Sequence, residues 1–426
     1  MYKGIKKNSF LSGAAVYLFA NILSAAIPFV LLPVLTRYLT PAEYGEVAVF
    51  QTILGALGAF LGLNATAAAG VKYYDSDMAE SELKLYIGNC FFVLLASTSI
   101  VLLVAVAFSK SISNWLSIDG KWLVIGVIVS CASFITLMRT GQWQVRKKAK
   151  YFGLFQVSQS LLNMLFSLLL VVYFLKGAEG RIWVLAGVPV LYALMALYLL
   201  YKDGLLEFSW RPKYLREILL FGVPLVPHAV GGFLLSSADR FMINSELGLA
   251  QVGVYMVAAQ IAAALGMVFD AINNAYVPWL FERLKRNNLH EKQQIVKWTY
   301  IYCLTLIGVA LMAFIVGPYL VILIAGESYR SAGEVIGWIV FGQIFNGMYL
   351  MVTNYIFFSK KTGILSLTTI TSGLINIGLL SILIGLMGLK GAAMAFCISM
   401  ACKFFLTWYV AQLRHPMPWF SFRSST

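Results

Sequence analysis

Charge is scarce in this chain of 426 residues. Charged residues make up 12% of the sequence, whereas 60% of it is hydrophobic. A soluble domain usually carries about 25% charged and about 45–50% apolar residues. A water-soluble fold could not bury so much apolar surface, so lipid must form part of the solvent. The composition therefore predicts an all-α polytopic membrane protein.

Cysteine and histidine are too few and too scattered for a metal centre or a disulfide framework. The five cysteines lie in apolar runs with no CxxC pair, and the three histidines are far apart. Isolated cysteines in such runs are typical of small buried hydrophobic residues, and zinc needs clustered ligands. A GxxxxGK[ST] motif is also lacking. We therefore expect no metal, no cofactor and no nucleotide site.

What the chain does contain is a series of long apolar runs. A membrane-spanning helix needs about 20 mostly apolar residues, and twelve runs meet that length. The connecting loops are short and leave no room for a soluble catalytic domain, so we expect a protein that is not an enzyme. The predicted spans are residues 11–36, 46–70, 86–108, 122–140, 153–175, 182–201, 218–241, 252–278, 298–317, 332–357, 364–385 and 391–412.

Lysine and arginine gather on one side of these spans. With the N-terminus inside, twenty-three of the 32 basic residues fall in inner segments and eight in outer ones, and Lys403 lies within a span. Cytoplasmic loops carry such an excess of Lys and Arg. We therefore expect both termini in the cytoplasm, and membrane orientation, not nucleic acid, explains the net charge of +14. The basic start, with Lys3, Lys6 and Lys7, leads into a first span and not into a cleavable signal peptide.

Two short motifs recur about half a chain apart. LTPAEYGEVAVFQ (39–51) is echoed by LGLAQVGVYMVAAQ (247–260), and Lys176–Ala178 by Lys390–Ala392. Because six spans is an even number, two halves of six would enter the membrane from the same side. They would be parallel repeats related by a pseudo-two-fold axis along the membrane normal. The sequence thus predicts two six-helix bundles, residues 1–205 and 206–426.

The repeated segments also carry a family resemblance. LPVLTRYLTPAEYGEVAVF (32–50) and ADRFMINSELGLAQVGVYMVAAQ (238–260) resemble the polysaccharide flippases. The chain is similar to Wzx-type O-antigen flippases, within the superfamily of multidrug, oligosaccharidyl-lipid and polysaccharide exporters. That resemblance implies a MATE-like V shape and a place in the bacterial inner membrane. It implies movement of undecaprenyl-pyrophosphate-linked oligosaccharide repeat units to the outer leaflet by alternating access through a cationic central cavity.

Other functions stay open beside that resemblance. An ion-coupled multidrug antiporter of the same superfamily would need an acidic lumen, and a membrane-embedded polysaccharide polymerase would be expected to show a long outer loop or an intramembrane His/Asp cluster. The expected partners are the lipid-linked oligosaccharide, membrane lipids, and the polysaccharide polymerase with its chain-length machinery. No nucleic acid is expected.

Charges inside the predicted spans are the candidate site residues, since charge at the bilayer centre is costly and usually faces a cavity or a partner. Lys403 lies in the middle of AFCISMACKFFLTWYV (395–410) and could attract pyrophosphate, or it could snorkel towards the interface. Asp270, in the eighth span, could couple transport to protons, pair with Lys403, or be structural.

Charges at the ends of spans form a second group. Asp239 and Arg240 end the predicted seventh span, where Arg240 could guide a headgroup and Asp239 could pair with it or cap the turn. Arg37 could guide substrate at the outer end of the first span or anchor that span. Arg139 and Lys72 close the fourth and second spans at the inner side, where they could receive pyrophosphate or serve as positive-inside anchors.

Overall fold

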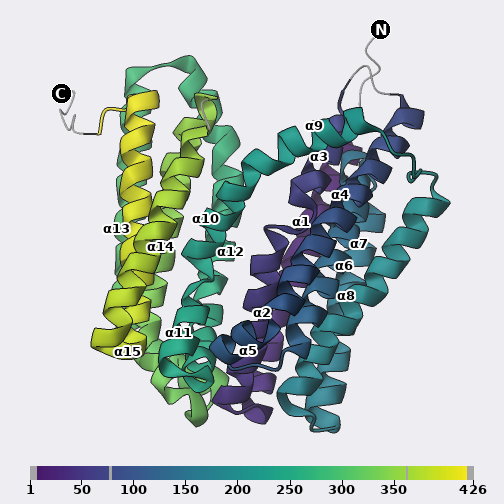
Figure 1. Cartoon of the computed structure of the whole chain (residues 1–426). Coiled ribbons are helices and arrows are strands. Elements are labelled where there is room, and N and C mark those ends of the chain that lie inside the picture. The colour runs from purple at the N-terminus through teal and green to yellow at the C-terminus, as the bar shows by residue number, and fades with distance from the viewer. Residues whose placement is uncertain (1–6, 76–78, 361–362, 420–426) are drawn as a thin grey trace. The chain divides into compact units, whose positions relative to one another are not determined.

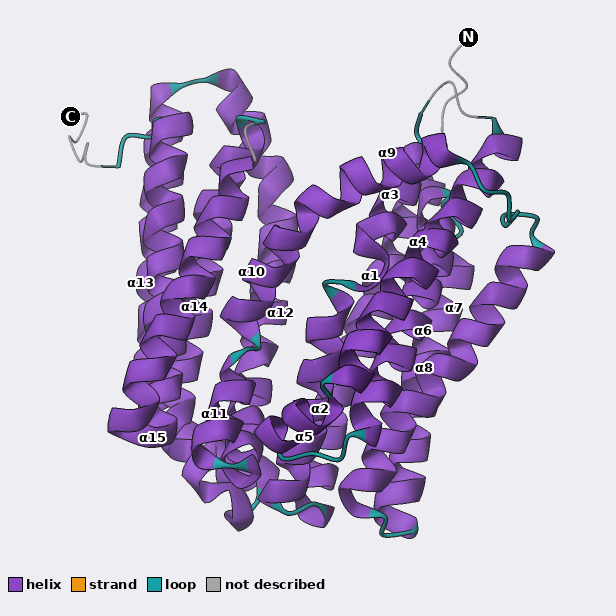
Figure 2. Ribbon diagram, viewed as in Figure 1, coloured by secondary structure: helices purple, strands orange, loops and turns teal. Residues whose placement is uncertain are grey.

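The computed structural model describes residues 7–75, 79–360 and 363–419. Every regular element within these ranges is helical (Figures 1 and 2), so the predicted all-α class is confirmed. Lys3, Lys6, Lys361 and Arg423, which contributed to the predicted orientation, lie outside the described residues.

Packing divides the chain into two compact units, Met1–Val230 and Gly231–Thr426. The helices of the first unit are α1 (Lys7–Tyr38), α2 (Pro41–Gly58), η1 (Leu61–Asn64), α3 (Ala65–Lys72), α4 (Glu80–Ala107), α5 (Ser109–Leu116), α6 (Lys121–Val145), α7 (Ala149–Ser167), η2 (Leu168–Tyr173), α8 (Gly177–Lys202), α9 (Pro212–Gly222) and η3 (Val223–Leu225). Helix α10 (Val226–Ser236) crosses the division. The second unit continues with α11 (Asp239–Leu247), α12 (Leu249–Arg286), α13 (Leu289–Ala325), η4 (Glu327–Ala332), α14 (Gly333–Phe358) and α15 (Gly363–Arg414).

The division at Val230 reflects the packing of α9, which contacts α3 and α4 of the first unit. The predicted boundary between residues 205 and 206 was placed between the two repeated halves of the sequence, not from packing. It stays a prediction.

Ten described helices are long and apolar enough to cross a membrane, or eleven if α2 and the bent η1–α3 segment form one broken span. Helix α15 has 52 residues. At about 1.5 Å per residue it would be roughly 78 Å long if straight, more than twice the about 30 Å of the hydrocarbon core. It breaks at Gly388, with φ 57° and ψ −137°. Its two parts therefore correspond to the predicted spans 364–385 and 391–412.

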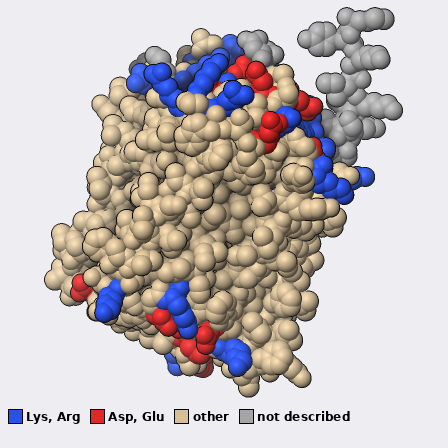
Figure 3. Space-filling view, turned by 45° about the vertical axis from the view of Figure 1, so that its right-hand side comes forward, with Lys and Arg blue, Asp and Glu red and all other residues tan. Residues whose placement is uncertain are grey.

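Charged side chains are arranged as a membrane protein requires. On the face shown in Figure 3 they gather at two opposite ends, and an uncharged band lies between them. Many large apolar side chains are exposed along the helices, among them Leu103, Leu304 and Leu386. Lipid can surround such side chains, whereas their exposure to water would be unfavourable.

One predicted span, residues 46–70, is bent by 52° between α2 and the η1–α3 segment. Gly62, Leu63 and Asn64 all have positive φ at the bend. The N–H of Gly62 donates to Ser97 Oγ at 2.9 Å, and Asn64 Nδ2 donates to the carbonyl of Gly222 at 3.3 Å. The first bond satisfies a backbone N–H at the break, and both are tertiary contacts that stabilise the bend.

The predicted span 218–241 is also interrupted. Pro224 and Pro227 lie where α9, η3 and α10 meet, and proline lacks the N–H that a continuous helix needs. Helix α10 ends at Ser236, and α11 begins at Asp239. Asp239 and Arg240 therefore begin a helix, whereas the sequence predicted that they end one.

The repeated motifs lie at corresponding kinds of junction. Thr40 caps α2 through a capping box with Glu43, in which the N–H of Glu43 donates to Thr40 Oγ1 at 3.3 Å. Helix α12 begins after Gly248, whose φ is +85°. Gly45 and Gly253 are both buried one turn into these helices. Each motif therefore joins two helices.

Candidate functional site

A cavity of about 360 Å³ lies within the second unit. Helices α10, α11, α12, α14 and α15 all contribute to its wall. The polar side chains that line it are Ser236, Asp239, Arg240, Tyr255, Gln343, Asn346, Thr369 and Lys403. So many polar groups converging within an apolar helical bundle are typical of a binding site.

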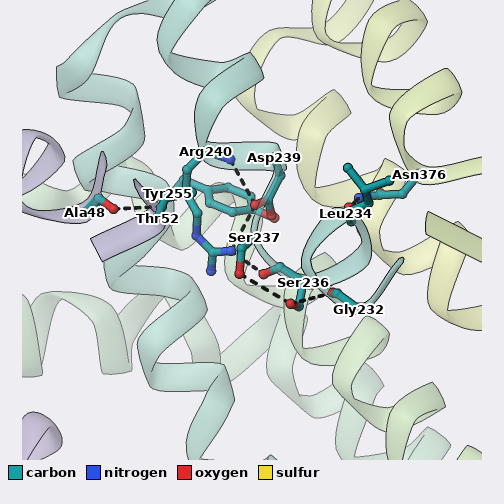
Figure 4. A network of polar contacts seen from close by, with 10 residues as sticks. All are labelled: Ala48, Thr52, Gly232, Leu234, Ser236, Ser237, Asp239, Arg240, Tyr255 and Asn376. Atoms are coloured by element: carbon teal, nitrogen blue, oxygen red, sulfur yellow. Dashed lines mark hydrogen bonds and ion pairs between the residues drawn. The ribbon is translucent and has the colours of Figure 1, made fainter. Parts of the chain in front are cut away.

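Asp239 is the buried centre of a small polar cluster, which Figure 4 shows. The side chain of Asp239 is about 2% exposed. The hydroxyl of Tyr255 donates to Asp239 Oδ2 at 2.6 Å, and Arg240 Nη1 donates to Asp239 Oδ1 at 3.0 Å. Arg240 also donates to the carbonyl of Ser236, at the break between α10 and α11. The Asp239–Arg240 ion pair therefore links the end of α10 to the start of α11, and its two opposite charges cancel.

Lys403 supplies the unbalanced charge of the cavity. Its ammonium nitrogen lies 3.9 Å from the centre of the Tyr349 ring, which is within cation–π range. In the described part of the chain, no carboxylate lies within ion-pair distance of it. Because Asp239 is neutralised by Arg240, the cavity keeps the positive charge of Lys403. The neutral side chains Gln343 and Asn346, one turn apart on α14, add hydrogen-bonding groups.

Three predicted site residues thus share one cavity: Lys403, Arg240 and Asp239. The suggestion that Asp239 pairs with Arg240 agrees with the observed contact. The suggestion that Asp270 pairs with Lys403 is wrong, because Asp270 is exposed on α12 and forms no ion pair among the described residues. The neighbouring Phe269 packs against Gly347 of α14. Successive helical residues point about 100° apart, so Asp270 does not point towards α14 as Phe269 does.

The other predicted cations lie in the first unit. Lys72 pairs with Asp75 at 3.2 Å and with Glu217 at 3.0 Å, which favours a structural role. Arg37 is exposed at the end of α1 and donates to the carbonyl of Pro33 in its own helix. A role for either residue in substrate binding stays a prediction.

Arg139 of α6 is 2% exposed and pairs with Asp203, the residue directly after α8. Its guanidinium carbon lies 4.3 Å from the centre of the Trp143 ring. A salt bridge of this kind ties two helices together, so the contact gives Arg139 a structural role at the end of α6. Its predicted role towards pyrophosphate stays a prediction.

Two features were missed from the sequence, one around this cavity and one in the first unit. Tyr255 and Tyr349 could not be singled out, because the chain has 22 tyrosines. Arg181 was counted as a charge at the outer end of a span, but it is 6% exposed and donates to Asn163 Oδ1 at 2.7 Å and to Ser167 Oγ. Asn163 and Ser167 lie four residues apart and therefore on one face of α7. This spacing is the feature of the sequence that could have indicated a shared polar partner.

Fold and site together define the class of the protein: it is a polytopic α-helical membrane protein with a polar cavity inside its second unit. Its residues 10–284 match the model of the polysaccharide biosynthesis protein family, and the chain belongs to that family. This confirms the family that the sequence motifs resembled.

Comparison with known proteins extends the likeness along nearly the whole chain. An uncharacterized membrane protein of Haemophilus influenzae is 26% identical, over 88% of this chain and 91% of its own length. A putative O-antigen transporter of Shigella flexneri is 22% identical, over 89% of this chain and 93% of its own. The solved structure of the lipid II flippase MurJ, in an inward closed conformation, superposes with a TM-score of 0.73 over 94% of this chain and 87% of its own at 12% identity, which shows a shared fold.

Proposed function

We propose that this protein is a flippase for lipid-linked oligosaccharides. In this proposal it moves undecaprenyl-pyrophosphate-linked repeat units of a surface polysaccharide from the inner to the outer leaflet of the bacterial cytoplasmic membrane. Membership of the polysaccharide biosynthesis family supports the proposal, as does the similarity to a protein named as a putative O-antigen transporter. The observation that carries it is the unpaired positive charge of Lys403 in a polar intramembrane cavity.

Flipping requires no bond to be made or broken. The obstacle is the passage of a charged pyrophosphate and many hydroxyl groups through hydrocarbon, where unsatisfied polar groups are strongly disfavoured. Lys403 would attract the phosphates as a point charge, while Gln343 and Asn346 would offer hydrogen bonds to sugar hydroxyls. The polyprenyl tail would stay in lipid. Polymerase and chain-length proteins would then use the delivered unit at the outer face.

The charge of the cavity also bears on the antiporter alternative. An exporter of cationic drugs needs an accessible carboxylate, but Asp239 already accepts from Arg240 and Tyr255. An anionic headgroup is therefore the better match for the free charge of Lys403. Asp270 stays a candidate for proton coupling, since its side chain is exposed and unpaired among the described residues.

Substitutions of Lys403 test the proposal in a strain that lacks the gene and any redundant flippase. Lys403→Met keeps the length of the side chain and removes its charge, and Lys403→Arg keeps the charge. A hydrogen bond to a charged group contributes about 1.5–3 kcal/mol, so we expect Lys403→Met to lower delivery of repeat units to the cell surface by about tenfold or more. Lys403→Arg should retain part of the activity.

Lys390→Met is the matched control, because Lys390 is exposed on the same helix and does not line the cavity. It should be fully active at equal expression. Full activity of Lys403→Met would remove Lys403 from the site. Normal surface polysaccharide in the deletion strain itself would contradict the proposed function.

A further inference from the structure

A second cavity, of about 600 Å³, lies entirely within the first unit. The last turns of α6 and α8 and the first turns of α7 form its wall. According to the distribution of basic residues, this end of the unit faces the cytoplasm. The cavity around Lys403, on which the proposed function rests, is a separate one within the second unit.

The cavity contains a buried cation with free donors. Arg139 lines it, and one guanidinium nitrogen, Nη2, pairs with Asp203. Arg139 Nε and Nη1 are buried and have no hydrogen-bond partner among the described residues. Buried polar groups are normally hydrogen-bonded, so two nitrogens with unused N–H donors beside a cavity indicate a missing acceptor.

Further features around Arg139 favour an anion as that acceptor. Lys148 and Lys202 also line the cavity and form no ion pair in the described ranges, so three basic residues face one carboxylate. Helix α7 has 19 residues and begins at Ala149 without a side-chain cap. Its free first-turn N–H groups attract negative charge in the way that helix N-termini bind phosphate.

The rest of the cavity is mostly apolar, and several of its side chains are exposed. Leu154 lines it and is 73% exposed, and Met195 and Tyr151 line it and are also exposed. The ring of Tyr151 stacks on Trp143 at 6.2 Å, and Trp143 in turn lies under Arg139. A ligand here would place an anionic group against Arg139 and a hydrocarbon chain along α7 and α8.

We propose that this cavity binds an anionic phospholipid of the cytoplasmic leaflet as a resident ligand. Arg139, Lys148 and Lys202 hold its phosphate, and the groove beside Leu154 and Met195 holds an acyl chain. A lipid-linked oligosaccharide has the same phosphate chemistry, but it also carries a glycan. This cavity has no Asn or Gln in its lining, whereas the cavity around Lys403 has both. The inference stands independently of the proposed function.

The test uses the full-length protein in nanodiscs of phosphatidylcholine, with or without phosphatidylglycerol. Lys148→Gln/Lys202→Gln removes two exposed cations that line the cavity and leaves the Arg139–Asp203 pair intact. The matched control, Lys147→Gln/Lys150→Gln, removes the same charge from exposed positions of the same region outside the lining. The readouts are the melting temperature and the phospholipid retained in native mass spectrometry.

We expect phosphatidylglycerol to raise the melting temperature of the wild type and of the control by about 3 °C or more, with one lipid retained. Lys148→Gln/Lys202→Gln should lose both effects. If the control lost the rise in melting temperature and the retained lipid equally, the cause would be general surface charge, and the proposal would be overturned. Inorganic phosphate in phosphatidylcholine discs should have no effect, and stabilisation by it would point to free phosphate. Stronger stabilisation by undecaprenyl pyrophosphate than by phosphatidylglycerol would make the cavity a substrate site and also overturn it.

Discussion

At the scale of single residues, the two carboxylate oxygens of Asp239 hold different partners. One accepts from Tyr255 at 2.6 Å and the other from Arg240 at 3.0 Å. Asp239→Ala would leave the arginine charge and the tyrosine hydroxyl without a partner, and breaking a buried ion pair in this way typically costs about 3–5 kcal/mol. We expect a large loss of thermal stability in detergent or nanodiscs. Asp239→Asn, which can still accept a hydrogen bond, should lose less, and equal stability of all three proteins would contradict the assigned contacts.

The same residues show what could be predicted of the site. Lys403 stood out because charges within apolar runs are rare, and Asp239 and Arg240 stood out because they end a predicted span. That all three share one cavity depends on the packing of α11 against α15 and α12, which no pattern in the sequence encodes. Lys72 illustrates the opposite case: its charge was visible, but Glu217, which neutralises it, lies in the distant helix α9.

At the scale of secondary structure, Gly388 divides α15 into two spans. Its φ of 57° and ψ of −137° fall in a region that essentially only glycine occupies. We expect Gly388→Ala to destabilise the fold by about 1–3 kcal/mol, as measured by thermal unfolding. Gly385→Ala is the matched control, because Gly385 lies on the same helix, has no positive φ, and has open space around an added Cβ. If the Gly388→Ala protein were as stable as this control, the break in α15 would not require a backbone conformation special to glycine.

Hydropathy predicted the helices well because each span is a long apolar run, and every predicted span overlaps a described helix. It could not predict the breaks within them. Leu63 and Asn64 adopt positive φ in the middle of a span, which is uncommon for leucine. The bend is stabilised by the bonds of Gly62 to Ser97 and of Asn64 to Gly222, and such tertiary contacts override local propensity.

At the scale of the whole molecule, the distribution of basic residues predicts how the protein is inserted, and α13 allows a direct test. This helix has 37 residues, and single cysteines at its two ends should lie on opposite sides of the membrane. Arg283, Lys285, Arg286 and Lys292 surround the end near His290, whereas Arg330, paired with Glu327, is the basic residue nearest the end at Ser328. In a variant without the five native cysteines, a membrane-impermeant maleimide should label Ser328→Cys in intact cells. His290→Cys should react only after the membrane is permeabilised, because an excess of Lys and Arg retains its loop in the cytoplasm. The reverse labelling pattern would mean that the predicted orientation is inverted and, with an even number of spans, that both termini lie outside. Labelling of both cysteines in intact cells would mean that α13 does not cross the membrane.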